Sequence, residues 1–236
     1  LLGVNLDIQS PLVIDSRLDD TTQEVALNAN TDSFSLNDKP YAAAVVALSS
    51  PLDTILLDTR LTKIMDNGDA MRLKAHCSAA DNKLHTSLYW DNGSATKPMS
   101  GNINAIASFF TRDDNQKAAT ISIVPSHINI GDKQWDVMAS NISYAKNDID
   151  IRQFKIEHNG QHIIVNGRAS DRDTDSLLID LNAVDVEYVL NLVNFHSVKF
   201  DGDASGRAVI VAPFGKMSAY AKLNVNNFLF ENGRMG

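Results

Sequence analysis

Phe154 to Val165 reads FKIEHNGQHIIV, and this stretch carries the strongest fold signal in the chain. Asn159-Gly160 at its centre is the dipeptide most typical of a tight β-hairpin, because both central residues of a type I′ turn need a positive φ. A two-residue turn at this point pairs the flanking residues in a definite register. That register places four apolar side chains on one face: Phe154, Ile156, Ile163 and Val165. We therefore expect a half-buried antiparallel hairpin.

The same dipeptide occurs three more times, at Asn67-Gly68, Asn92-Gly93 and Asn232-Gly233. Each occurrence predicts a turn between antiparallel strands. A two-residue turn at Asn67-Gly68 would place Lys63 opposite Arg72, which is unfavourable, so a bulge or a longer loop is the alternative there. Antiparallel pairing is thus expected over most of the chain.

Apolar and polar residues alternate with period two in many other segments, which predicts strands with one buried face. The apolar rows are Val4/Leu6/Ile8, Met71/Leu73/Ala75/Cys77, Leu84/Thr86/Leu88/Trp90, Ile103/Ala105/Ala107/Phe109, Leu177/Ile179/Leu181 and Met217/Ala219/Ala221/Leu223/Val225. Residues 185–193 depart from this pattern, because apolar residues at helical spacing follow Asp185, a residue type favoured at helix N-caps. They predict one short helix, whereas residues 51–65 fit either a strand or a helix.

The fold class expected from the residues is therefore mainly β and mostly antiparallel. The chain has no Pro/Gly/Ser-rich linker and no shift in composition, so residues 1–236 are expected to form a single β-repeat segment. Its sequence starts without Met or a basic signal region, and Gly236 directly follows a hairpin signal. We expect a segment of a longer protein.

Composition excludes several classes of partner and site. The formal net charge is −8 and no basic stripe is present, which argues against binding to nucleic acid. No apolar run approaches the ~20 residues with which a helix spans a bilayer. Cys77 is the only cysteine, so an internal disulfide and a cysteine-based metal cluster are excluded. It continues an apolar row and is expected to be a small core residue, with His76 on the opposite face.

Motifs for nucleotide binding, serine hydrolysis, zinc peptidases and thiol redox chemistry are missing, and we expect no catalysis, no cofactor and no metal. His158 and His162 flank the predicted turn, so their side chains point to opposite faces rather than to a shared metal. Asp171 to Asp175 starts like a calcium loop, but Ser176 and Asn182 stand where such a loop has glycine and glutamate. We interpret this segment as an acidic turn.

Residues 118–236 contain an ordered series of short motifs. They are ISIVPSHINI at 121–130, Trp135, the hairpin at 154–167, SLLIDL at 176–181, GDASG at 202–206 and NFLFENGRMG at 227–236. In this order they resemble the repeating β-unit of the TamB family of bacterial envelope proteins, within the wider AsmA-like group. The first half of the chain matches only in strand character. These motifs are degenerate β-repeat patterns, and the family has no catalytic residues to carry over.

The resemblance implies an elongated, curled sheet with an apolar inner groove. It implies a periplasmic location, within a protein that is anchored in the inner membrane and reaches the outer membrane. It also implies an outer-membrane β-barrel assembly partner, bound through other regions. The implied role is to carry phospholipid acyl chains or unfolded segments of β-barrel proteins.

The residue pattern is compatible with a groove, because a sheet that has one aliphatic face and little helix to cover it must either close on itself or remain an open groove. Such a groove can hold acyl chains, since each buried methylene contributes about 0.8 kcal/mol. The residues expected to line it are Phe154, Ile156, Ile163, Val165, Leu177, Ile179, Leu181, Met217, Ala219, Ala221, Leu223 and Val225. Two alternatives stay open: a β-sandwich that recognises a glycan or a protein through its loops, and a right-handed β-helix enzyme, against which the antiparallel hairpins argue.

Overall fold

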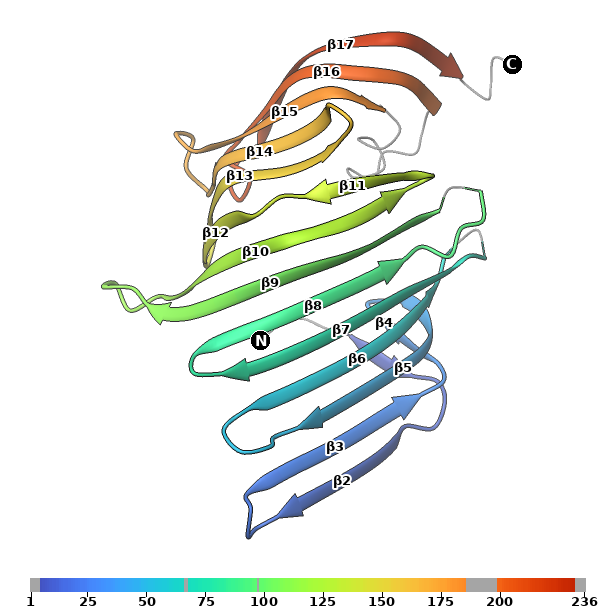
Figure 1. Ribbon diagram of the computed structural model, residues 1–236, viewed down its shortest axis with the longest axis vertical. Helices are drawn as coiled ribbons and strands as arrows, with labels where there is room; N and C mark the ends of the chain where they lie inside the picture. The colour runs from blue at the N-terminus through green and yellow to red at the C-terminus, as the bar shows by residue number, and fades with distance from the viewer. Residues whose placement is uncertain (1–4, 66–67, 97, 186–198, 232–236) are drawn as a thin grey trace. The chain divides into compact units, whose positions relative to one another are not determined.

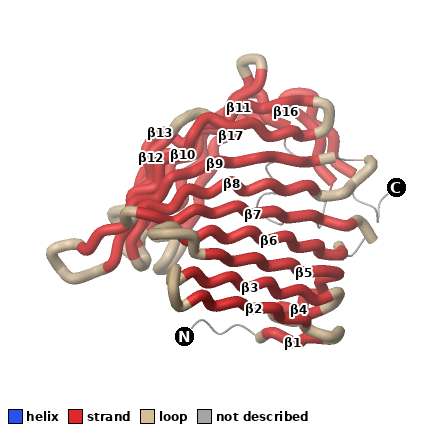
Figure 2. Tube along the Cα trace, turned by 60° about the horizontal axis from the view of Figure 1, so that its bottom comes forward, coloured by secondary structure: helices blue, strands red, loops and turns tan. Residues whose placement is uncertain are grey.

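The computed structural model describes residues 5–65, 68–96, 98–185 and 199–231. This described part forms seventeen strands. It contains no helix, as Figure 2 shows. The strands belong to one sheet, and their registers are antiparallel. The predicted mainly β, antiparallel fold is thereby confirmed, and a two-sheet sandwich or a parallel β-helix does not describe it.

Contacts along the chain divide it into two compact units, which are described separately. Unit 1 comprises Leu1–Phe109 and Val124–Trp135, and unit 2 comprises Phe110–Ile123 and Asp136–Gly236. The strands that lie within unit 1 are β1 (Leu6–Ile8), β2 (Val13–Asp19), β3 (Glu24–Thr31), β4 (Phe34–Leu36), β5 (Lys39–Ser49), β6 (Ile55–Ile64), β7 (Ala70–Ala80) and β8 (Lys83–Asp91). Residues of β9 (Met99–Thr111), β10 (Lys117–Ile130) and β11 (Lys133–Val137) belong to both units. Unit 2 continues with β12 (Ser140–Ala145), β13 (Asp148–His158), β14 (Gln161–Ala169), β15 (Ser176–Asp185), β16 (Lys199–Val211) and β17 (Ser218–Glu231).

The centre of unit 1 is a ladder in which β5, β6, β7, β8 and β9 lie side by side (Figure 1), with one register shift, between Tyr41 and Ala43 of β5. β6 pairs with β7 without a break from Ile55↔Ala79 to Ile64↔Ala70. Residues 51–65, which fit either a strand or a helix by sequence, thus contain strand β6. The alternation of apolar and polar residues favours a strand here, because in each strand of the ladder every second side chain lies on the same face of the sheet.

The turn at Asn67-Gly68 differs from the two-residue hairpin that its sequence predicts. The alternative of a longer loop is confirmed: the register is shifted, so that Lys63 pairs with Met71 and Arg72 pairs with Thr62. The Met65 amide donates to the Asp69 carbonyl, so the loop is one residue longer than a tight turn. Gly68 has a φ of 87°, as the last residue of a three-residue hairpin loop requires. The longer loop removes the like-charge pair from the ladder.

Unit 1 carries a mainly apolar face built from cross-strand rows. Three rows run from β3 through β5, β6, β7 and β8 to β9: Leu27–Leu48–Leu57–Cys77–Thr86–Ala105, Ala29–Val46–Thr59–Ala75–Leu88–Ile103 and Thr31–Ala44–Leu61–Leu73–Trp90–Gly101. A Cβ on Gly101 would overlap the indole ring of Trp90. Glycine at this position therefore makes room for a large aromatic side chain on the face.

In unit 2 the β13–β14 hairpin has the register that its sequence predicts. Phe154 pairs with Val165, Ile156 with Ile163, and the turn residue Asn159 has a φ of 45°. The short helix expected at 185–193 falls mainly on residues 186–198, which lie outside the described part of the chain. Asp185, expected as its N-cap, is the last residue of β15 and pairs with Asp203.

Candidate functional site

Strands β13 to β17 of unit 2 present a continuous apolar face, named the aliphatic face below. Three rows build it, each with one residue from every strand: Ile156–Ile163–Leu181–Gly206–Leu223, Phe154–Val165–Ile179–Ala208–Ala221 and Ile151–Gly167–Leu177–Ile210–Ala219. Val184, Ala204 and Val225 extend it beyond the first row. No charged side chain stands in these rows, so the face offers hydrocarbon contacts across five strands.

The structure brings together on this face all the predicted groove residues except Met217. Met217 precedes β17, and its side chain is 64% exposed. Sequence reasoning missed the contribution of β16, namely Ala204, Ala208 and Ile210. Period-two spacing across Ala204, Gly206, Ala208 and Ile210 was the signal that could have revealed this strand.

Burial across the aliphatic face is uneven. Val184 and Ala204, on β15 and β16, are 0% and 1% exposed, and Leu181 is 5% exposed. At the outer strand, Leu223 is 39% exposed, and Ala219 and Ala221 are exposed as well. The face is therefore closed to solvent at its end around Leu181, Val184 and Ala204, half-buried along the rest of β15 and β16, and accessible along β17.

Bulges interrupt three of the five strands. The one in β17 lies between Asn226 and Leu229 and contains Asn227, with a φ of 53°. The other two, in β13 and β15, lie among the rows of the aliphatic face.

The register shifts between Ile151 and Phe154 in β13 and between Leu181 and Val184 in β15. Within each shift lies a non-glycine residue with positive φ, Gln153 at 52° in the first and Ala183 at 48° in the second. Bulges of this kind bend a strand and raise its local twist, so they set the curvature of the face.

Each of the bulges in β13 and β15 is held by the strand next to it. The Gln153 amide donates to Asn166 Oδ1 at 2.9 Å, and the Ala183 amide donates to Ser205 Oγ at 2.8 Å. These side chains satisfy amides that the ladder leaves unpaired.

A glycine with positive φ follows each bulge-binding residue: Gly167 follows Asn166, and Gly206 follows Ser205. A Cβ on either glycine would overlap a backbone carbonyl of the next strand, that of Ser176 or Lys222 respectively. The same device, a bulge with an Asn-Gly or Ser-Gly pair beside it, thus occurs twice in unit 2.

The opposite face of unit 2 carries ion pairs. Asp180 accepts hydrogen bonds from Arg207 Nε at 2.9 Å, and its other oxygen lies 3.1 Å from His162 Nε2. Hydrogen bonds from Arg207 and then His162 lower the pKa of Asp180 below its ordinary value. These three residues lie on the face opposite the aliphatic face, because they alternate along their strands with the residues of that face.

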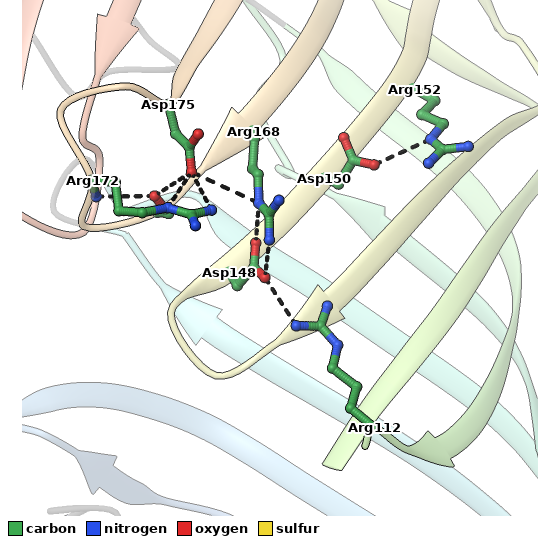
Figure 3. A network of polar contacts seen from close by, with 8 residues as sticks. Arg112, Asp148, Asp150, Arg152, Arg168, Arg172 and Asp175 are labelled. Carbon is green, nitrogen blue, oxygen red and sulfur yellow. Dashed lines mark hydrogen bonds and ion pairs between the residues drawn. The ribbon is translucent and has the colours of Figure 1, made fainter. Parts of the chain in front are cut away.

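A second charged cluster joins the start of β13 to the end of β14 and the loop that follows. Figure 3 shows Arg168 between two carboxylates, those of Asp148 and Asp175. Asp148 accepts from Arg168 Nε at 2.6 Å and from Arg112 at 3.0 Å. Asp175 accepts from Ser170 at 2.7 Å and from Arg172 at 2.7 Å. The cluster ties four segments of the unit together: the loop that contains Arg112, the start of β13, the end of β14 and the loop after β14.

The arginines of this cluster hold its carboxylates in the charged form. The hydrogen bond from Arg168, against a smaller opposing effect of burial, lowers the pKa of Asp148 from 3.8 to about 2. Arg112 adds to this lowering. The Ser170 hydroxyl and then Arg172 lower the pKa of Asp175.

The remaining residues singled out from the sequence are two histidines, an acidic turn and the pair His76 and Cys77. His158 and His162 point to opposite faces, as predicted, because His158 pairs with Gln161 and His162 with Glu157. Residues 171–175 form the predicted loop between β14 and β15. Cys77 stands in an apolar row of unit 1 but is only half-buried, and Thr86 Oγ1 donates to its sulfur at 3.8 Å. His76 lies on the other face, and its Nδ1 is 2.8 Å from Asp58 Oδ1.

Over the described residues, no group of three or more histidine, cysteine or acidic side chains is arranged to hold a metal ion. The same part of the chain contains no helix that could cross a membrane. Comparison with family models, with curated proteins and with solved structures gives no match. The aliphatic face is thus the candidate site, on the strength of this chain's own residues.

Proposed function

We propose that this chain is a non-catalytic segment of a TamB-like envelope protein and that its aliphatic face holds phospholipid acyl chains. In this proposal the segment works in the periplasm, within a protein anchored in the inner membrane. A β-barrel assembly partner in the outer membrane is contacted through other regions of that protein. The observation that carries the proposal is the composition of the three rows on β13 to β17, which hold only aliphatic residues, Phe154 and two glycines.

The chemistry of the face suits a long hydrocarbon chain. Each methylene transferred from water to an apolar surface contributes about 0.8 kcal/mol, so a 16-carbon chain gains on the order of 10 kcal/mol when fully covered. The rows offer Ile, Leu, Val and Ala side chains and no unpaired polar group that would need a partner from the ligand. Entry is supported at β17, where Leu223 and its neighbours are exposed.

Unfolded segments of β-barrel proteins are the second candidate occupant. An extended segment also carries backbone N–H and C=O groups, which the hydrocarbon side chains of this face cannot pair. An acyl chain is apolar on all sides. The uniform composition of the rows therefore favours the lipid.

The test compares two neighbouring residues of β17 whose side chains belong to opposite faces of the sheet. Leu223 belongs to the aliphatic face, and Asn224, paired with Ser205, belongs to the other face. Leu223→Arg should lower binding of a phospholipid with a photoactivatable acyl chain about tenfold, which corresponds to about 1.4 kcal/mol. Asn224→Arg, which introduces the same side chain one position away, should leave lipid capture unchanged.

Circular dichroism checks that both variants keep their strand content, since an arginine on an outer strand can extend to solvent. Equal lipid capture by Leu223→Arg and the unchanged chain contradicts the proposal. Loss of lipid capture in both variants contradicts it as well, because the effect would not depend on the face. A competing β-barrel peptide that displaces no lipid would argue against the second occupant.

A further inference from the structure

The face of unit 1 opposite its apolar rows contains a shallow hollow over β7, β8 and β9, three strands that lie side by side in Figure 1. Most of the side chains that line it on these strands are polar, and two of them are histidines on neighbouring strands. The lining includes His76 and Ser78 of β7, His85 and Ser87 of β8, and Asn104 and Ile106 of β9.

The register of the strands places Ser87 at the floor of this hollow. Ser87 pairs with His76 on one side and with Asn104 on the other, and His85 lies two residues before it on the same face. A serine side chain is short, so the longer side chains around it leave space above it. His76 and His85 are diagonal neighbours across β7 and β8, at about 7–8 Å, a distance that long side chains bridge. The two imidazoles can therefore meet above Ser87.

Asp58 of β6 fixes the orientation of one of these imidazoles. Asp58 pairs with His76, and its Oδ1 lies 2.8 Å from His76 Nδ1. An ionised carboxylate can only accept a hydrogen bond, so Nδ1 carries the hydrogen and Nε2 of the neutral ring presents its lone pair. A carboxylate behind a histidine is the usual arrangement at metal sites, where it sets the tautomer and makes the imidazole a stronger ligand. His76 thus has the tautomer that binds a metal through Nε2.

The turn between β7 and β8 creates this pair of histidines. Asp81 and Asn82 have φ values of 49° and 60°, as the two central residues of a type I′ turn require. Ala80 therefore pairs with Lys83, and the same register sets Ser78 opposite His85. His76 and His85 are nine residues apart in the sequence, which is not the spacing of a common metal motif. The motifs of the sequence thus gave no sign of the pair.

We propose that His76 and His85 bind a divalent transition metal ion, Zn²⁺ or Cu²⁺, with Asp58 as the carboxylate behind His76. Imidazole nitrogen is a ligand that both ions favour, and Cu²⁺ binds the more tightly of the two. The side-chain oxygen of Asn104 and water complete the coordination. Two histidines and an amide make an open site, in contrast to a closed centre of three or more histidine, cysteine or acidic ligands. The site belongs to unit 1 and does not rest on the proposed lipid binding.

Isothermal titration of the full chain with Zn²⁺ tests this site. The unchanged chain should bind one ion at this site, and His76→Ala and His85→Ala should each abolish that binding. Asp58→Asn keeps both imidazoles and should weaken it about tenfold, the lower end of what loss of such a carboxylate costs.

The matched control is His162→Ala in unit 2. His162 also lies beside a carboxylate, that of Asp180, but its cross-strand partners are Glu157 and Asn182 and not a second histidine. This variant should bind Zn²⁺ like the unchanged chain. Circular dichroism checks that each variant keeps its strand content, which is expected because the side chains of Asp58 and His76 are more than half exposed.

Electron paramagnetic resonance of the Cu²⁺ complex identifies the ligands directly. Two coordinated imidazoles are expected in the unchanged chain and in Asp58→Asn, and one in His85→Ala. A chain that binds neither Zn²⁺ nor Cu²⁺ contradicts the proposal. Zn²⁺ binding that is unaltered in His76→Ala or His85→Ala, or lowered equally in His162→Ala, places the ion elsewhere and contradicts it as well.

Discussion

Units 1 and 2 build apolar faces from the same kind of antiparallel strand, but the faces differ in composition and regularity. The rows of unit 1 include Thr31, Thr59 and Thr86, and its ladder from β6 to β9 runs without a register shift. The rows of unit 2 contain only aliphatic residues, Phe154 and glycine, and its ladder is bulged at Gln153 and Ala183. Strands β6 to β9, which pair without a shift, thus carry a mixed face, whereas the aliphatic face is found on bulged strands.

The bend in unit 2 has a local cause that can be removed one residue at a time. Two amides at bulges are bound by side chains of the neighbouring strand, and two glycines beside them allow close approach of backbones. Unit 1 uses a glycine differently, because Gly101 faces the side chain of Trp90. Backbone contacts cannot rearrange as a side chain can, so the two units should respond differently to the same substitution.

The largest effect is expected from Gly206→Ala. The φ of Gly206 is 141°, and the added Cβ meets the Lys222 carbonyl, so the free energy of unfolding should fall by at least about 3 kcal/mol. Gly101→Ala in unit 1 meets a rotatable indole and should cost about 1–3 kcal/mol. Urea unfolding followed by circular dichroism measures both.

Both tryptophans, Trp90 and Trp135, belong to unit 1, so their fluorescence separates the two variants. Gly101→Ala should change this fluorescence in the folded state, and Gly206→Ala should not. A Gly206→Ala chain as stable as the unchanged one would show that the close approach in unit 2 carries no constraint.

A smaller effect is expected from Asp148→Asn, which removes the carboxylate bound by Arg168 and Arg112. Charged hydrogen bonds at a partly solvated site suggest a loss of about 1–2 kcal/mol. Asp150→Asn is the matched control, because its partner Arg152 is largely exposed and the pair should contribute little. Urea midpoints at neutral pH compare the two variants.

The same carboxylate predicts a dependence of stability on pH. The pKa of Asp148 is lowered from 3.8 to about 2 in the folded chain, so the unfolded chain binds its proton first. The stabilisation is complete above the unfolded pKa and is lost as pH falls through about 2. The unchanged chain should therefore lose more stability than Asp148→Asn over this window. Parallel pH profiles of the two would contradict the assigned role.

The smallest stability effect is expected from Asn166→Ala, which removes the acceptor of the Gln153 amide. Loss of one hydrogen bond to a bulge should cost about 1 kcal/mol. Amide hydrogen exchange should become faster at Gln153 and stay unchanged at Ala183, whose amide is bound by Ser205. Ser87→Ala in unit 1, at an exposed side-chain pair with Asn102, should change neither stability nor exchange. Slow exchange at Gln153 in Asn166→Ala would show that the bulge is held by something else.

Much of the fold follows from patterns that act over a few residues. The Asn159-Gly160 turn fixed the pairing of Phe154 with Val165 because turn and alternation agree there. At Asn67-Gly68 the same dipeptide left two loops open, and the longer one is present, with Gly68 at the position that needs positive φ. A dipeptide alone does not distinguish the two loops.

The candidate site was predictable as rows of apolar residues and not as a bent face. The alternation in β17 placed Ala219, Ala221 and Leu223 together, and the register with β16 agrees. Gln153 and Ala183 carry no sequence mark of a bulge, because neither residue type favours positive φ. Their conformation depends on Asn166 and Ser205 of the neighbouring strands, which are distant in sequence.

Photo-crosslinking from single positions tests whether the aliphatic face of unit 2 holds acyl chains. A photoreactive amino acid is placed at Ala221 on the aliphatic face, at Tyr220 on the opposite face, and at Leu88 on the apolar face of unit 1. The chain is then irradiated with phospholipid vesicles. Crosslinked phospholipid at Ala221, with little at Tyr220 and Leu88, is the predicted result. Capture that is equal at the three positions, or absent at Ala221, would contradict the claim.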